Sequence, residues 1–237
     1  MTEAWDLQTD MFLSTVEVDA LLTHLETRAE RTKGRTQQSA RLDEMIVVAL
    51  LLSGLRSSEF CELAVGNTIV GTGVSAFVVH RRAGPGRMVC VPQRVSDLVR
   101  GYVDEVRPRF LPAEVDPDDQ KQPLVFNEHR RPYERSGLYR RVVRILTEAG
   151  LGDRASVQLL RHTYGYLAYL RTGGNLLFVQ RQLGHAHPRI TSVYAELVEE
   201  SYADLAERVA GESAVWTAER RERVYKQCRP AFDCAVD

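Results

Sequence analysis

The residues of this chain best suited to chemistry are arginines, histidines and a tyrosine in two short segments. In the first segment, Arg56 follows a strongly apolar run that stops at Gly54, so it falls at the N-terminal end of the next predicted helix. Free backbone amides at a helix start favour anions, and a guanidinium there would clamp a phosphate. Glu59, one helical turn later, would orient Arg56. Taken alone, such an Arg-x-x-Glu pair is most often a simple surface ion pair.

The second segment is longer and its spacing is more informative. It contains, in order, Gln158, Arg161, His162, His185 and Tyr194; His185 follows Arg161 by 24 positions and Tyr194 follows His185 by nine. Each residue also has an ordinary structural explanation: histidines occur in cores with satisfied partners, tyrosines pack, and arginines cap helices. The joint order and spacing therefore carry the argument for a shared site, and no single residue does.

Together the two segments resemble the tyrosine recombinase (phage integrase) family. That family has Gly-Leu-Arg-x-x-Glu, then His-x-Leu-Arg-His-Thr, then Leu-Gly-His, and a tyrosine nine residues later. The resemblance covers roughly residues 13–200 and implies an α+β, mostly α-helical catalytic-domain fold with a small antiparallel β-sheet. It also implies a site-specific DNA recombinase or integrase that needs no metal and no cofactor. The implied catalytic residues are Arg56, Gln158, Arg161, His185 and Tyr194, supported by Glu59 and His162.

The implied reaction explains these residue types. A phenol hydroxyl attacks a backbone phosphate, which leaves a 3′-phosphotyrosyl link and a free 5′ hydroxyl, and resealing needs no ATP. Arg56 and Arg161 would stabilise charge on the non-bridging oxygens. His185 would donate a hydrogen bond or help Tyr194 lose its proton, because a phenol has an ordinary pKa near 10. His162 would lie beneath Arg161 as a support.

Two departures from the family pattern bear on activity. Gln158 stands where the family commonly has histidine; glutamine donates hydrogen bonds but cannot shuttle a proton. The family also places a lysine on a β-hairpin turn as the general acid, whereas here Arg81 and Arg82 occupy that turn. Arginine grips phosphate well but its pKa above 12 makes it a poor acid. We expect retained but weakened cleavage.

The domain organisation follows from the same resemblance. We expect residues 1–12 to form an N-terminal arm, residues 13–200 the catalytic domain, and residues 201–237 a helical tail that packs on its own domain or exchanges between protomers. Family members carry a separate core-binding domain that completes a clamp on DNA. Only 55 residues precede Arg56, so we expect no N-terminal core-binding domain, and weak, salt-sensitive DNA binding.

Hydrophobic patterning predicts the elements that hold these residues. A Ser or Thr cap at residues 14–15 should start a first helix, residues 29–40 should form a loop or frayed helix end, and residues 42–52 a buried helix. Residues 74–80 and 88–91 flank a Gly-Pro-Gly turn and predict a β-hairpin with a basic tip. A helix is predicted at residues 95–106, an extended segment at 124–126, and helices from Glu134 onward.

Charge distribution, rather than the net charge of −1, points to nucleic acid. Residues 154–195 hold five arginines and three histidines without an acid, and residues 77–96 hold four arginines without an acid. From these zones we expect DNA contacts through Arg81, Arg82, Arg87, Arg181 and Arg189, and double-stranded DNA as the partner. Four scattered cysteines suit reduced thiols, and Cys228-x5-Cys234 lacks a second ligand pair, so no metal is expected. Neither a signal peptide nor a membrane span is apparent, which predicts a cytoplasmic protein.

Three functions remain open at this point. The leading hypothesis is a recombinase that assembles on DNA as a homo-oligomer, a tetramer in the synapse. The first alternative is a recombinase-derived DNA-binding module with weak or no catalysis, which Gln158 and the missing hairpin lysine favour. The second is a topoisomerase-like enzyme that nicks and reseals DNA with the same tyrosine but exchanges no strands.

Overall fold

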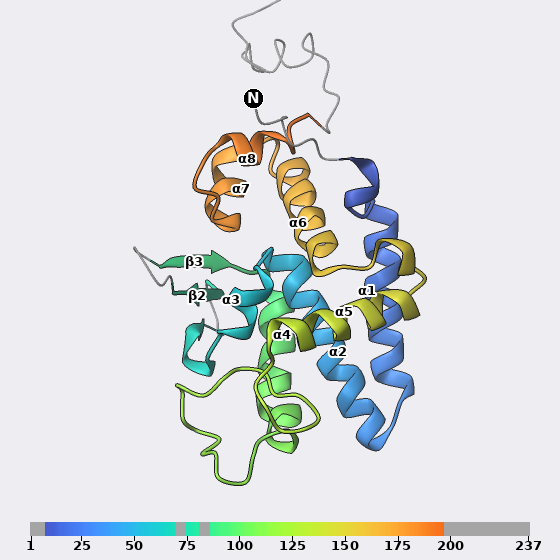
Figure 1. Ribbon diagram of the computed structural model, residues 1–237, viewed down its shortest axis with the longest axis vertical. Helices are drawn as coiled ribbons and strands as arrows, with labels where there is room; N and C mark the ends of the chain where they lie inside the picture. The colour runs from blue at the N-terminus through green and yellow to red at the C-terminus, as the bar shows by residue number, and fades with distance from the viewer. Residues whose placement is uncertain (1–7, 70–73, 81–85, 197–237) are drawn as a thin grey trace, which may run out of the picture. The chain divides into compact units, whose positions relative to one another are not determined.

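A computed structural model describes residues 8–69, 74–80 and 86–196 of the chain. The chain divides into two units, residues 1–197 and 198–237, and the second lies outside the described residues together with the predicted tail. The first unit is mostly helical with one small sheet (Figure 1). Its helices are α1 (Thr15–Arg31), α2 (Gly34–Ser53), α3 (Ser57–Cys61), α4 (Gln93–Gly101), α5 (Arg135–Glu148), α6 (Val157–Arg171), α7 (Leu176–Leu183) and α8 (Arg189–Ser192), and its strands are β1 (Thr68–Ile69), β2 (Ala76–Val79) and β3 (Arg87–Cys90).

The first two helices form the frame of the unit. Ser14 caps α1: its hydroxyl accepts from the backbone of Glu17, whose carboxylate accepts in return from the backbone of Ser14, as the sequence predicts. The predicted loop at residues 29–40 is wrong. α1 continues to Arg31 and α2 already begins at Gly34, because polar side chains of this stretch bond to neighbouring elements; the Gln37 amide, for example, donates to the carbonyl of Ala29.

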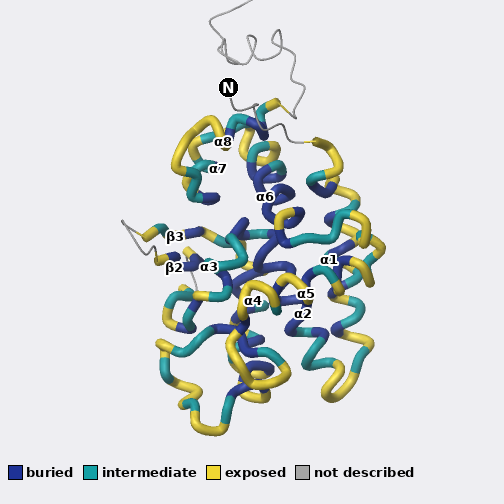
Figure 2. Tube along the Cα trace, in the orientation of Figure 1, coloured by how far each residue is buried: buried dark blue, intermediate teal, exposed yellow. Residues whose placement is uncertain are grey.

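The C-terminal half of α2 is the centre of the main core. Nearly every residue from 42 to 51 is buried, and Gly54 ends the helix with a left-handed φ of 63°, as predicted. The same core takes residues from α1, α4, α5, α6 and the sheet (Figure 2). A smaller cluster gathers Tyr164, Val179, Leu183 and Tyr194 around the ends of α6 and α7.

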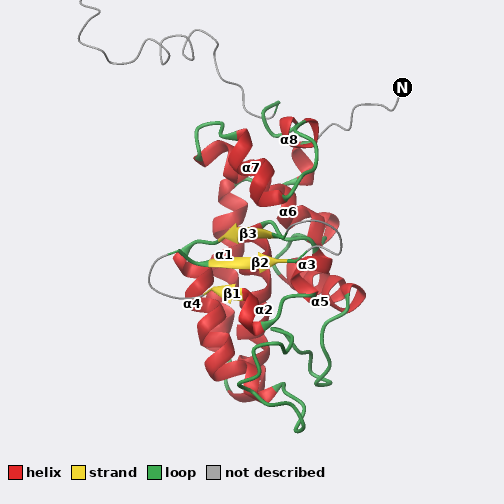
Figure 3. Cartoon of the chain, turned by 90° about the vertical axis from the view of Figure 1, so that its left-hand side faces the viewer, coloured by secondary structure: helices red, strands yellow, loops and turns green. Residues whose placement is uncertain are grey.

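The predicted hairpin is confirmed and extends to a three-stranded antiparallel sheet of order β1-β2-β3. Phe77 pairs with Val89 across the hairpin, so both side chains point into the core. The two-residue strand β1 was too short to predict from alternation. β3 is the strand that lies next to α7 (Figure 3). The hairpin tip with Arg81 and Arg82 lies outside the described residues.

The remaining connections differ in detail from expectation. The helix predicted at residues 95–106 begins earlier, at Gln93, and passes into a π-helical turn (Tyr102–Val106) and a 3-10 turn (Arg107–Arg109). Of residues 124–126, predicted as an extended segment, Phe126 forms an isolated antiparallel bridge with Pro132, while Leu124 lies in a bend. Further 3-10 turns lie at Thr9–Met11, Val65–Asn67 and Gly152–Arg154.

The described part of the predicted N-terminal arm is packed on the domain. Phe12 is buried, and its ring centroid lies 4.4 Å from that of Tyr166. The backbone of Leu13 donates to the hydroxyl of Thr163 at 2.9 Å. A buried backbone N–H needs a hydrogen-bond acceptor, and that of Leu13 has one in Thr163. At least residues 12 and 13 therefore belong to the folded domain. Among the described helices, none is both long and apolar enough to cross a membrane.

Candidate active site

Arg161 joins the C-terminal ends of two helices. It lies on α6, is 6% exposed, and its guanidinium donates to the carbonyl of Gly54, after α2, and to that of Leu183, at the end of α7, the latter at 2.8 Å. Helix C-termini carry partial negative charge, so two of them stabilise a buried cation. Burial, followed by the charge of Arg56, lowers the pKa of Arg161 to about 10, and it remains charged at neutral pH.

Arg56 reaches the same place from the start of α3. Its guanidinium donates to the carbonyl of Gly184 at 3.3 Å and to the carboxylate of Glu59 at 2.9 Å. Because Gly184 directly follows Leu183, Arg56 and Arg161 are anchored on consecutive carbonyls. The Arg56 side chain is 42% exposed, so the pair has one buried and one solvent-accessible guanidinium. The expectation that the two arginines come together is met.

Glu59 forms ion pairs with Arg56 and Arg87, and the sequence predicted only the pair with Arg56. Besides Arg56, it accepts from both terminal nitrogens of Arg87 on β3, at 2.6 and 2.9 Å. Burial alone would raise the pKa of Glu59, but the hydrogen bonds from Arg87 and from the backbone of Arg56 outweigh it and lower the pKa to about 2. The carboxylate is therefore ionised throughout the physiological range and ties the sheet to α3.

Two glycines are required by this packing. Gly184 has a left-handed φ of 64°, and a Cβ there would lie 2.7 Å from the guanidinium carbon of Arg87. Gly54, at φ 63°, would place a Cβ 2.4 Å from the ring of Tyr164. Because Gly54 and Gly184 have no side chain, Tyr164 and Arg87 can pack directly against them. The backbone carbonyls of these two glycines accept hydrogen bonds from Arg161 and Arg56.

His185 lies at the edge of the arginine pair and is half-buried. Its Nδ1 is 2.9 Å from the hydroxyl of Thr191 on α8. Burial, then the charges of Arg161 and Arg56, lowers the pKa of His185 to about 4, so the ring is neutral at pH 7. Thr191 was not predicted as a site residue; its place three residues before Tyr194 was the available signal.

Tyr194 follows α8 and is 1% exposed. Its ring lies flat on Gly165 of α6, where an added Cβ would come within 2.2 Å of the ring carbon that bears the hydroxyl. The hydroxyl lies 3.3 Å from Nδ1 of His162. Burial raises the pKa of Tyr194 to about 12, against a lowering by Arg161, while burial and then the charge of Arg161 lower that of His162 to about 4. In this arrangement both groups are neutral at pH 7.

The other predicted site residues lie at the surface or outside the described residues. Gln158 is exposed on the first turn of α6, one turn before Arg161, and Arg181 and Arg189 are exposed on α7 and α8. Arg87, predicted to contact DNA, is 11% exposed and engaged by Glu59. Within the described ranges, no group of three or more acidic, histidine or cysteine side chains is arranged to hold a metal ion.

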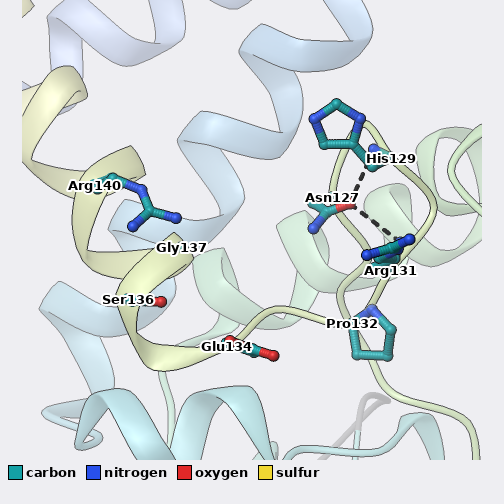
Figure 4. Close-up of a pocket in the computed structure, with 8 residues that line it drawn as sticks. All are labelled: Asn127, His129, Arg131, Pro132, Glu134, Ser136, Gly137 and Arg140. Carbon is teal, nitrogen blue, oxygen red and sulfur yellow. Dashed lines mark hydrogen bonds between the residues drawn. The ribbon is translucent and has the colours of Figure 1, made fainter.

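A separate hollow of about 600 Å³ lies between the loop at residues 127–132 and the first turns of α5 (Figure 4). Its lining includes Arg131 and Arg140 together with His129, residues that the sequence did not single out. None of the predicted site residues lines it. The backbone amides of His129 and Arg131 both donate to the side-chain oxygen of Asn127, which fixes the loop.

A helical domain with a small antiparallel sheet that gathers two arginines, a histidine and a tyrosine in this order defines a class, the catalytic domains of tyrosine recombinases. The comparison with family models agrees: the model described as Phage integrase family matches residues 11–201, and the chain belongs to this family.

Its similar proteins are larger than the matched segment. Tyrosine recombinase XerD of Oceanobacillus iheyensis is 27% identical over 194 residues, which cover 81% of this chain and 60% of the relative. Tyrosine recombinase XerC of Lactobacillus leichmannii is 28% identical over 152 residues, 64% of this chain and 49% of the relative. The chain thus matches about half to three fifths of these relatives.

Solved structures show the same fold. A XerH site-specific recombinase bound to palindromic difH substrate in a post-cleavage complex has a TM-score of 0.67 at 19% identity, covering 84% of this chain and 53% of that one. The Tn1549 transposon integrase in complex with transposon right end DNA has a TM-score of 0.63 at 14% identity, covering 88% and 68%.

Proposed function

We propose that this chain is the catalytic domain of a site-specific DNA recombinase or integrase, with Tyr194 as its nucleophile and double-stranded DNA as its substrate. One observation carries the proposal: Arg56 and Arg161 are anchored on the adjacent carbonyls of Gly184 and Leu183. Two guanidinium groups held side by side offer more N–H donors than these carbonyls use, and a phosphate takes paired donors well.

The proposed step exchanges one phosphate ester bond for another, so the bond energy is kept. The Tyr194 oxygen forms a bond to phosphorus, the bond from phosphorus to the 5′ oxygen breaks, and the 5′ oxygen takes up a proton. The phenol proton passes to a neighbouring base. Rejoining is the reverse reaction, in which a 5′ hydroxyl displaces Tyr194, so no energy source is consumed. Arg56 and Arg161 stabilise the charge that grows on the non-bridging oxygens.

His185 serves this step as a neutral hydrogen-bond donor. With Nδ1 accepting from the hydroxyl of Thr191, the ring carries its proton on Nε2 and donates it toward the phosphate. A neutral ring with a pKa of about 4 is a weak acid–base catalyst at pH 7 unless a bound phosphate raises that pKa. The negative charge of DNA beside the ring does so, which couples substrate binding to proton transfer.

Tyr194 has to move before it attacks. Its hydroxyl is buried between Gly165 and His162, where a DNA phosphate cannot reach it. A phenol with a pKa of about 12 is also a poor nucleophile. Displacement of the turn that carries Tyr194 brings the hydroxyl to the arginines, whose charge then lowers its pKa. His162 holds the resting position, a role different from the support beneath Arg161 expected from the sequence.

The remaining predicted residues complete the proposal. Arg81 or Arg82 of the hairpin grips the DNA backbone in place of a general-acid lysine, and exposed Gln158 donates to a phosphate oxygen. Exposed Arg181 and Arg189 add phosphate contacts. The named solved structures include a recombinase and an integrase captured on DNA, which supports duplex DNA as the partner. That the chain acts as a homo-oligomer, a tetramer in the synapse, is part of the proposal and rests on the family resemblance.

A second candidate function is a DNA-binding module that does not cut. Two features favour it. The side chain of Tyr194 is buried, and arginines stand at the hairpin turn where the family has a general-acid lysine, so cleavage lacks an accessible nucleophile and a ready acid. This candidate keeps the arginine pair as a phosphate clamp. It differs from the recombinase in forming no covalent link to DNA.

A covalent-trapping assay separates the two. The chain is incubated with a DNA duplex that carries a 5′-bridging phosphorothiolate, whose sulfur leaves without a general acid, and the products are run on a denaturing gel. We expect a protein–DNA band that Tyr194→Phe abolishes and Arg56→Lys weakens. No band from the unchanged chain, with DNA binding intact at low salt, supports the non-cutting module. Relaxation of a supercoiled plasmid without recombinant products supports the topoisomerase-like alternative.

A further inference from the structure

A second groove lies between α1, α2 and α4, and its charge is opposite to that of the candidate active site. It has a volume of about 500 Å³. The acidic residues that line it are Glu26, Glu30, Glu44, Asp97 and Glu105, against the single basic residue Arg41. Phosphates are repelled by such a surface, so this groove does not take DNA. The connection between α1 and α2 lies at the end of the unit away from α7 and α8, and α4 runs toward that end from the sheet (Figures 1 and 3).

Glu44 is the unusual member of this set. It is 8% exposed, yet within the described residues its carboxylate makes neither a hydrogen bond nor an ion pair, although it lines the groove. The nearby arginines are engaged elsewhere: Arg41 pairs with Glu105, and Arg94 lies 3.6 Å from Glu26. Burial, and then the charge of Glu26, raises the pKa of Glu44. The charges of Arg94 and Arg41 act against this rise, but neither arginine forms an ion pair with Glu44. A buried carboxylate is normally paired directly with a cation, so the position suits an additional positive charge.

The rest of the lining suggests which cation fits. Ala29, Leu98 and Val106 give the groove an apolar wall beside its acidic groups. A long side chain with an apolar stem and a charged tip matches both, as arginine and lysine do when their stems pack and their heads pair. A bare metal ion does not match, because the described residues hold no group of three ligands arranged for one.

We propose that this acidic groove binds an arginine or lysine side chain presented by a partner protein, with Glu44 as its ion-pair partner at the base. The groove is acidic and separate from the arginine pair, so DNA bound at that pair does not cover it. The partner is therefore a protein with an exposed basic segment. It contacts the recombinase–DNA complex at the acidic groove and not at the basic DNA site.

The test titrates a labelled hexa-arginine peptide into the full chain and follows fluorescence anisotropy. We expect Glu44→Gln to weaken binding at least tenfold. Glu114→Gln, which removes the same charge from an exposed residue outside the groove, should change binding less than twofold. Equal affinity of the two variants overturns the proposal. Since a core substitution can disturb folding, Glu30→Gln at the exposed rim provides a second variant, for which we expect an intermediate loss; no loss there counts against the groove.

Two further measurements identify the occupant. The carboxyl resonance of Glu44, followed by NMR against pH, should show a lower pKa once the peptide is bound, and an unchanged pKa overturns the proposal. Sedimentation of the chain alone tests the source of the cation. If the unchanged chain self-associates and Glu44→Gln does not, the groove binds a second copy of the chain and the partner-protein assignment is wrong.

Discussion

Two clusters in this molecule each contain three arginines, and they differ in how many carboxylates face them. At the junction of α1, α2 and α5, Asp43 is fully buried and accepts from all three local arginines, while two glutamates pair with the same arginines from outside. The members are Arg28, Arg141 and Arg144 with Asp43, Glu128 and Glu148. At the candidate active site, Arg56 and Arg87 pair with the single carboxylate of Glu59, while Arg161 donates to backbone carbonyls instead.

The difference in charge separates a structural cluster from an anion site. Three arginines against three carboxylates leave the first cluster neutral, whereas three against one leave the second with two positive charges in excess. Neutral histidines do not alter that count. A surplus of buried cation costs stability and is tolerated here because backbone carbonyls of Gly54, Leu183 and Gly184 stand in for missing anions. In the proposed function, a DNA phosphate would supply the missing negative charge.

The largest effect is expected from breaking the neutral cluster. Asp43→Asn leaves Arg141, which is 6% exposed, without its buried partner at 2.5 Å. Removing one member of a buried ion pair typically costs about 3–5 kcal/mol, so we expect a loss of this size in the free energy of unfolding by urea. Asp118→Asn, at an exposed turn, is the matched control and should stay within about 0.5 kcal/mol of the unchanged chain. Similar values for the two variants would contradict the structural role of Asp43.

Glu59→Gln tests the other cluster. The pKa of Glu59 is about 2 in the folded chain against an ordinary 4.5. A depressed carboxyl pKa stabilises the fold above pH 4.5, and this stability is lost as pH falls toward 2. At 1.4 kcal/mol per pKa unit the contribution at pH 7 is up to about 3 kcal/mol. The variant should be less stable at pH 7 and should lack this loss in acid. Parallel stability–pH curves for the two chains would show that Glu59 does not hold the arginines.

Gly165→Ala sharpens the comparison at Tyr194, the proposed nucleophile. The added Cβ cannot coexist with the ring of Tyr194 at 2.2 Å, so the tyrosine has to leave its seat. We expect a cost of about 1–3 kcal/mol from overpacking, and a Tyr194 pKa that falls from about 12 toward an ordinary value, read by NMR of labelled tyrosine. Gly137→Ala on α5 is the control, since its Cβ meets nothing closer than 3.7 Å. An unchanged Tyr194 resonance in Gly165→Ala would show that the ring of Tyr194 does not pack against Gly165.

The smallest effect concerns the histidines. The pKa of His162 is about 4 in the folded chain, below the ordinary 6.5, so the unfolded chain binds a proton first as pH falls. Stability contributed by neutral His162 is full above pH 6.5 and is lost as pH falls toward 4, by about 1 kcal/mol at pH 5.5. His162→Gln should flatten the stability–pH curve by that amount in this window. Retention of the full slope would assign the acid sensitivity to other groups, His185 first.

The parts of the fold that depend on local pattern were predictable. The Ser14 cap, the stop at Gly54 and the hairpin pairing of Phe77 with Val89 each follow from neighbouring residues. The start of α2 was not predicted, because polar residues 34–40 form a helix only through bonds to other elements, such as those that Arg141 makes to Ser39. Hydrophobic periodicity in the sequence indicates which faces are apolar and buried, but it does not indicate polar contacts between elements.

The site shows the same division. Motif order predicted that Arg56, Arg161 and His185 converge, and they do. The bond from Arg87 to Glu59 and the seat of Tyr194 on Gly165 were missed, because each joins residues 28 or more positions apart through shape and not through any repeated pattern. The interpretation of Arg87 as a DNA contact remains a prediction, and the structure adds a second task for that side chain.

The contacts that build the site also determine when during synthesis it comes into being. Leu13 bonds to Thr163, Arg161 to Gly54 and Arg56 to Gly184, across 150, 107 and 128 positions of the chain. Contacts of such sequence separation close late. A nascent chain that has not yet emerged from the ribosome as far as Gly184 offers Arg56 and Arg161 no adjacent carbonyls, and Tyr194 is made ten residues later still. Tyr194, the proposed nucleophile, is therefore among the last residues of the matched domain to be translated, so a chain that stops short of it lacks the group proposed to cleave DNA.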